Sequence, residues 1–147
     1  MKNLTRSVVT LSFFVVLTAS FVFAQGRTRV TADIPFDFTV GEKSMPAGKY
    51  IVQKHQTTNH LLVVQGKDSN KAAYAMFNDS TKSRGAEKTV LVFHRYGNEY
   101  FLSQMWAAGD SSGSEVSISK AERKARKGAD RNIAQNLEPE LITVVVD

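Results

Sequence analysis

Residues 90–102 read VLVFHRYGNEYFL, and this stretch decides the fold class of the chain. It opens with β-branched and aromatic residues, the types enriched in strands. Gly97-Asn98 is a two-residue loop of the primed-turn kind, which suits the twist of a β-hairpin. Counting outward from this loop predicts the antiparallel pairs Tyr96–Glu99, Arg95–Tyr100, His94–Phe101 and Phe93–Leu102. Because both faces carry large apolar groups, we expect this hairpin to be central in a sheet.

Other short apolar stretches extend the same pattern. The clearest alternation covers residues 33–40, where Ile34, Phe36, Phe38 and Val40 fall on one face of a predicted strand that includes Pro35 at an edge or bulge. Further strands are predicted over residues 49–55, 60–65, 71–78, 89–96, 99–107 and 141–146. Residues 41–48, 79–88 and 108–114 are predicted to be turns or loops. This spacing favours an all-β fold, either an antiparallel β-sandwich or a small barrel, without choosing between them.

One short helix is predicted over residues 120–127. Ser119 and Glu122 match a capping box, in which each side chain accepts a backbone N–H, and Gly128 is expected to end the helix. The cations of this helix are Lys120, Arg123, Lys124, Arg126 and Lys127. Such a surface could dock on anionic lipid, glycan or a protein partner, although a run of charge is more often a solvated face.

The N-terminus predicts export. Lys2 and Arg6 precede an apolar run over residues 8–23, and Val22 and Ala24 place small residues at the −3 and −1 positions of a cleavage site. The alternative, a membrane anchor, needs about 20 apolar residues, and this run is shorter and contains hydroxyl side chains. We therefore expect a signal peptide over residues 1–24 and one mature domain over residues 25–147, located in the periplasm or secreted.

Composition narrows the function classes. The chain has no cysteine, which excludes disulfides, thiolate zinc sites and lipid attachment to a cysteine. Its net charge is +5, and the two cations of the predicted signal peptide contribute part of it. The mature domain is therefore only mildly basic, and we expect no nucleic-acid partner.

Several motifs together resemble a family of small secreted bacterial proteins to which no activity is assigned. They are IPFDF with VG over residues 34–41, PAGKY over residues 46–50, LVFHRYG and YFL within residues 91–102, and SK with Glu122 at the predicted helix start. The resemblance implies a bacterial envelope or secreted setting. It implies no substrate, cofactor or functional residue.

Few residues suggest chemistry. His55 and His60 flank a polar loop, and if they close a hairpin, their side chains share one face and could hold a transition metal weakly. A zinc site normally needs three or four protein ligands, so a polar hairpin end is the simpler reading. His94 is expected to be packed and hydrogen-bonded, because no Gly-x-Ser-x-Gly nucleophile motif occurs.

These observations favour an exported, non-enzymatic β domain that binds or organises a component of the bacterial envelope, without a cofactor. A small barrel carrying an apolar ligand is the alternative, with Phe36, Phe38, Phe93, Phe101 and Trp106 lining its cavity. A metal-dependent hydrolase centred on His55 and His60 is a third hypothesis.

Overall fold

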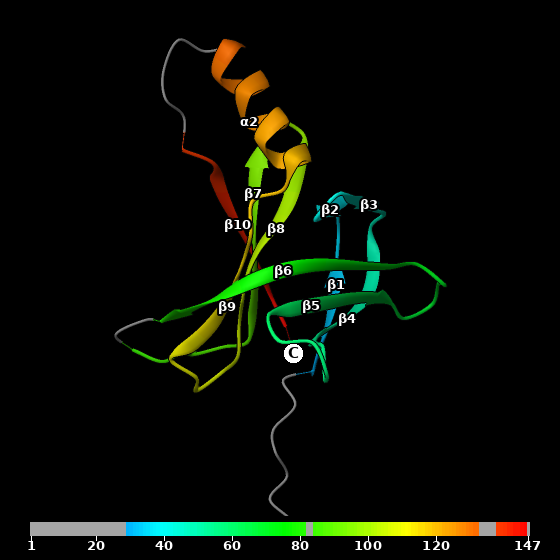
Figure 1. Cartoon of the computed structure of the whole chain (residues 1–147), viewed down its shortest axis with the longest axis vertical. Coiled ribbons are helices and arrows are strands. Elements are labelled where there is room, and N and C mark those ends of the chain that lie inside the picture. The colour runs from blue at the N-terminus through cyan, green and yellow to red at the C-terminus, as the bar shows by residue number, and fades with distance from the viewer. Residues whose placement is uncertain (1–28, 82–83, 133–137, 147) are drawn as a thin grey trace, which may run out of the picture.

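The computed structural model describes residues 29–81, 84–132 and 138–146, and within these residues it is mostly β with one helix (Figure 1). The elements are β1 Arg29–Ile34, β2 Phe38–Val40, β3 Lys43–Met45, β4 Gly48–Lys54, β5 Leu61–Gly66, β6 Ala72–Thr81, β7 Val90–Tyr96, β8 Glu99–Trp106, β9 Ser112–Val116, α2 Lys120–Asn132 and β10 Glu140–Val145. The mostly β fold class is confirmed. The predicted signal peptide lies outside the described residues.

The strands form one open, mixed sheet that folds over itself into sandwich-like layers. An antiparallel path runs β1-β4-β5-β6-β9-β8-β7-β10, and β2 joins β8 through a parallel pair at Thr39–Phe101. Strand β6 belongs to both layers, because residues 72–76 pair with β5 and residues 77–81 pair with β9. In Figure 1, β5 and β6 run across the upright strands β7, β8 and β10.

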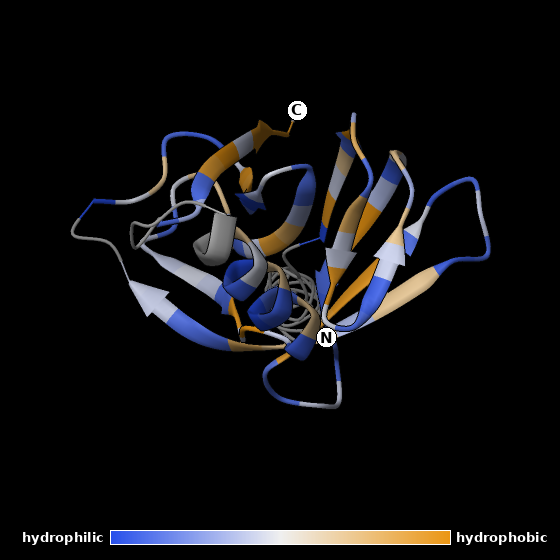
Figure 2. Ribbon diagram, turned by 90° about the horizontal axis from the view of Figure 1, so that it is seen from above, coloured by the Kyte–Doolittle hydropathy of each residue, from blue (hydrophilic) through white to orange (hydrophobic). Residues whose placement is uncertain are grey.

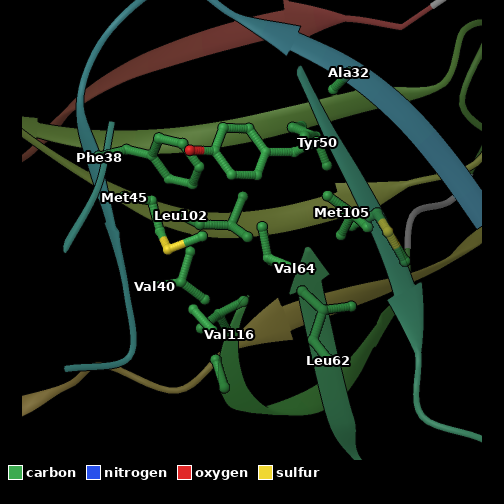
Figure 3. Close-up of a cluster of buried hydrophobic side chains, with 14 of the residues drawn as sticks. Ala32, Phe38, Val40, Met45, Tyr50, Leu62, Val64, Leu102, Met105 and Val116 are labelled. Carbon is green, nitrogen blue, oxygen red and sulfur yellow. The ribbon is translucent and has the colours of Figure 1, made fainter. Parts of the chain in front are cut away.

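Apolar side chains of both layers meet in one core. Figure 3 shows Phe38 and Tyr50 ring to ring, edge to face with their centroids 5.1 Å apart, above Leu102 and Val64. Each buried Val, Leu, Phe or Met side chain contributes about 1.5–3 kcal/mol relative to an exposed one. The inward positions are orange in Figure 2, whereas α2 is largely blue. This core, rather than the helix, holds the domain together.

The predicted β7–β8 hairpin is confirmed in register. All four predicted pairs occur, from Tyr96–Glu99 to Phe93–Leu102. Gly97 has a φ of 61°, and Asn98 has a negative φ, the pattern of a type II′ turn that glycine supplies without strain. The Arg95 guanidinium lies 5.5 Å from the centre of the Tyr100 ring, close enough for a cation–π contact.

The single strand predicted over residues 33–40 is wrong. The chain leaves β1 at Ile34 and re-enters a strand only at Phe38, so the two halves lie in different layers: β1 pairs with β4, and β2 pairs with β3 and β8. Pro35, which has no backbone N–H for a ladder, stands at the start of this break. The alternation persists across it, because Ile34, Phe38 and Val40 are all buried.

Three predicted loops contain strand. Residues 43–45 form β3, β6 continues to Thr81, and residues 112–116 form β9. Gly113 shows why the composition of the last segment misleads. A Cβ added there would lie 2.5 Å from the Trp106 ring, so glycine permits a close approach between paired strands rather than marking a loop.

The predicted helix begins where expected and ends later. Ser119 Oγ accepts the Glu122 N–H at 3.0 Å, as an N-cap does. The helix continues through Gly128 to Asn132, so the predicted end at Gly128 is wrong. The reciprocal half of the capping box is also absent, because Glu122 bonds to the sheet instead.

Candidate functional site

The start of α2 is fixed by an acid from a distant turn. Glu42, which lies between β2 and β3, accepts the N–H of Lys120 through Oε1 at 2.6 Å and that of Ala121 through Oε2 at 3.3 Å. Together with the Ser119 cap, this satisfies the N–H groups of the first three helical residues and places negative charge at the positive end of the helix dipole. The helix is therefore anchored to the β2–β3 turn.

Glu122 anchors the same turn of helix to the β7–β8 hairpin. Its Oε1 lies 2.6 Å from His94 Nδ1 and 3.3 Å from the Tyr96 hydroxyl, and the residue is only 4% exposed. His94 Nε2 lies 2.9 Å from Ser103 Oγ. An ionised carboxylate only accepts, so His94 donates from Nδ1, and the Nε2 of a neutral ring accepts from the serine hydroxyl. The predicted packed, hydrogen-bonded His94 is confirmed.

A β-bulge brings Ser103 into this chain of hydrogen bonds. On β7, Val92 pairs with Gln104 and Phe93 pairs with Leu102, which leaves Ser103 as the extra residue of β8. Bulges re-aim side chains and recur beside active sites. The order Ser103–His94–Glu122 has the connectivity of a serine, histidine and acid triad.

Burial decides what this triad-like chain does in the folded state. Ser103 is 3% exposed, and the His94 side chain is 19% exposed. The adjoining pocket of about 620 Å³ is lined by Tyr96, Gly97 and Glu99 from the hairpin and by residues of α2, but by neither Ser103 nor His94. A nucleophile must approach its substrate to about 3 Å. In this conformation, Ser103, His94 and Glu122 therefore act as an anchor beneath the helix.

The predicted cationic face of α2 is exposed. Four of its five cations line one surface groove of about 470 Å³, and Arg126 is not part of it. The four are Lys120, Arg123, Lys124 and Lys127. Their spacing of three, four and seven residues places them on one side of a helix. Glu122 is the only acid among residues 120–129, and it is buried against the sheet. It therefore does not neutralise the cations on the exposed side.

A second groove, of about 600 Å³, adjoins the first and shares Lys120 and Arg123 with it. Its walls include Tyr74 and Met76 of β6 and Ile118, which are 58%, 54% and 42% exposed. Tyr74 and Met76 lie in the strand predicted over residues 71–78, but none of these three apolar residues was predicted to belong to a site. The high exposure of large side chains on neighbouring segments becomes visible only once β6 is placed beside the start of α2.

The predicted arrangement of His55 and His60 is wrong. The His55 N–H donates to the Leu61 carbonyl, so His55 lies opposite Leu61 rather than His60. The φ of His60 is 59°, and its ring lies beside Phe77 and Asp79, with Nε2 3.6 Å from Asp79 Oδ2. His55 Nδ1 instead accepts the N–H of Thr58 at 3.0 Å.

Both histidines still line one shallow depression of about 240 Å³. Within residues 29–81, 84–132 and 138–146, no group of three or more potential metal-ligating side chains occurs.

The five aromatic residues proposed to line a ligand cavity have separate surroundings. Phe36 and Phe38 both contact Phe93 edge to face, at centroid distances of 5.2 and 5.5 Å, within the core. Phe101 lies against Tyr96 at 5.9 Å, and the Trp106 Nε1 donates to Gln104 Oε1 at 2.9 Å. These rings contact one another or their strand neighbours, and they are not grouped around one space.

Among the described residues, none of the helical segments combines the length and the apolar character needed to cross a membrane. No protein-family model, curated protein or solved structure matches this chain.

Proposed function

We propose that this chain is an exported, non-enzymatic β domain that binds an anionic partner through the cationic face of α2, in the bacterial envelope or outside the cell. The observation that carries the proposal is the groove lined by Lys120, Arg123, Lys124 and Lys127. Export rests on the pattern of residues 1–24.

The anchoring of α2 supports this function. Two nearby acids hold the helix in place. Glu42 accepts backbone N–H groups at the start of α2, and Glu122 is hydrogen-bonded to His94. The cations are therefore presented on a held element, so that less conformational entropy is lost when a partner binds. Clustered like charge also raises the rate of encounter with an anionic partner, and salt screens that effect.

Charge reversal on the helix tests the proposal. The variant R123E/K124E/K127E should elute from phosphocellulose at much lower salt than the unaltered protein. The matched control is K49E/K67E/K71E, which changes the net charge equally at three exposed lysines outside α2. Equal shifts for the two variants would show that net charge alone, and not the helix, drives binding, and would overturn the proposal.

The triad-like connectivity favours a second candidate function, hydrolysis of an ester. Ser103 Oγ would attack the acyl carbonyl while its proton passes to His94 Nε2, and Glu122 would hold the ring. The ester C–O bond would then break, and the alcohol would leave with the proton returned by His94. Water would then release the acyl group from the serine. Because Ser103 is buried, this chemistry requires a change of conformation that exposes Ser103 while Glu122 stays bonded to His94.

A fluorophosphonate probe distinguishes the second candidate. Labelling of the unaltered protein that is lost in S103A would establish an activated serine. No labelling of the folded protein leaves Ser103, His94 and Glu122 with the anchoring role alone.

A further inference from the structure

We infer that the anionic partner is the surface of a phospholipid bilayer, with Tyr74, Met76 and Ile118 entering the boundary between headgroups and acyl chains beside the cations of α2. This inference rests on the proposed function and names the partner of the same site. The surface defined by these three apolar residues together with Lys120, Arg123, Lys124 and Lys127 is called the amphipathic face below.

Continuity between the two grooves is the first argument. Lys120 and Arg123 line both the apolar groove and the cationic groove, so that the two form one surface. Proteins that bind at membrane interfaces combine cations for anionic headgroups with large apolar side chains for the region just below them. The amphipathic face combines both within one stretch of surface.

The apolar residues distinguish a bilayer from other anionic partners. A soluble polyanion would neutralise the cations but would leave the exposed side chains of Tyr74, Met76 and Ile118 in water. Exposed apolar groups that gather at one site, rather than scatter singly, indicate an interaction surface. A bilayer accommodates both components of the amphipathic face.

Charges bordering the apolar groove agree with this assignment. Lys43 adds a further cation there, with its Nζ donating to the Ala72 carbonyl at 2.7 Å. Glu42 is the acid on this wall, and both of its carboxylate oxygens accept N–H groups of α2. The groove is therefore complementary to anionic headgroups rather than to neutral ones.

Membrane contact by α2 alone would not be expected. Its small apolar residues Ala121 and Ala125 line the pocket facing the β7–β8 hairpin and are not free to insert into lipid. The apolar component comes instead from β6 and from Ile118, just before the helix. This is why inspection of the helix sequence by itself shows only a charged face.

The absence of cysteine from the chain allows a direct test by single labelling. The exported domain, residues 25–147, carrying M76C with an environment-sensitive fluorophore is mixed with vesicles of phosphatidylglycerol and phosphatidylcholine in a roughly 1:2 ratio, or with phosphatidylcholine alone. We expect a blue shift with the anionic vesicles only. The control S111C lies in the β8–β9 turn, far from α2, and should show no shift (Figure 1).

Two variants separate the components of the amphipathic face. R123E/K124E/K127E should weaken vesicle binding by about 100-fold, because each Lys or Arg near an anionic membrane surface adds favourable binding free energy. Y74S/M76S should weaken vesicle binding by about tenfold and leave elution from phosphocellulose unchanged.

The outcomes distinguish this inference from the proposed function. Helix-dependent retention on phosphocellulose without vesicle binding would overturn the bilayer assignment and leave the anionic-partner function standing. Equal binding to both kinds of vesicle would overturn the role of the cations in lipid recognition. If R123E/K124E/K127E were retained on phosphocellulose as strongly as the unaltered protein, the proposed function itself would be overturned.

Discussion

The Glu122 carboxylate is buried and accepts hydrogen bonds from two donors, His94 and Tyr96. Removing one partner of a buried charged pair leaves the other without compensation. We expect H94A to lower the free energy of unfolding by about 3 kcal/mol, because it leaves the buried Glu122 carboxylate without its histidine donor.

The double variant H94A/E122A should be less destabilised than the sum of the single variants, with a coupling energy of about 0.5–3 kcal/mol. Urea unfolding of the four proteins in this cycle measures it. Simple additivity would mean that the 2.6 Å contact between His94 and Glu122 contributes no net interaction to stability.

Tyr50 gives the domain an alkaline limit of stability. Burial raises the pKa of its phenol above the usual value, and the nearby Asp37 carboxylate raises that pKa further. The folded state therefore holds the phenolic proton more tightly than the unfolded chain, whose tyrosines ionise near pH 10. Tyr50 contributes this stability fully below about pH 10, and it is lost as the pH rises through the higher folded pKa.

Urea midpoints between about pH 8 and 11 should accordingly fall less steeply in Y50F than in the unaltered protein. The substitution also removes the hydroxyl that donates to the Pro46 carbonyl, so Y50F should be less stable near neutral pH. An unchanged alkaline slope in Y50F would show that other groups set the limit.

At the scale of elements, α2 offers two changes of opposite sign. A Cβ at Gly128 meets no atom within 4 Å, and glycine within a helix costs about 0.5–1 kcal/mol relative to alanine, so G128A should stabilise the protein by that amount. E42A removes the acceptor for two N–H groups at the helix start and should destabilise it by about 1 kcal/mol.

Thermal unfolding measures both changes, and faster amide exchange confined to the first turn of α2 would locate the effect of E42A. If E42A left those amides unaffected, the cap by Ser119 would suffice to fix the helix start.

Elements that are specified by residues adjacent in the sequence were predicted correctly, and elements that depend on distant partners were not. The β7–β8 hairpin was predicted in register because the Gly97-Asn98 turn and its flanking residues specify it without outside help. The break after Ile34 and the strand β9 were not predicted, because both depend on partners far along the chain. Gly113 is an example at a single residue, because the reason for a glycine there is the Trp106 ring packed against it.

The candidate site shows the same division. His94 was expected to be packed and hydrogen-bonded, whereas its partner Ser103 was not predicted, because the sequence does not show the β-bulge at Ser103. Glu122 was read as half of a capping box, because nothing in the sequence shows that the helix docks on β7. The five cations over residues 120–127 were visible from the sequence, whereas the exposure of Tyr74 and Met76 beside them required the tertiary structure.

The predicted export concerns the whole chain. When the full sequence is expressed in a bacterial host, we expect the exported protein to have the intact mass of residues 25–147, because the pattern of residues 1–24 predicts cleavage after Ala24. The matched variant A24L, with a bulky residue at the −1 position, should retain residues 1–24 or be cleaved elsewhere. An exported protein that keeps its full mass without this change would contradict the predicted signal peptide.

Strand β6 determines how the molecule comes apart. Its first half is bonded to β5 and its second half to β9, so each layer depends on the same ten residues for part of its backbone pairing. Loss of order in β6 as a whole would therefore remove backbone pairing from both layers. Unfolding should therefore be a single cooperative event, in which the central amides of β6 become accessible only when the entire sheet opens.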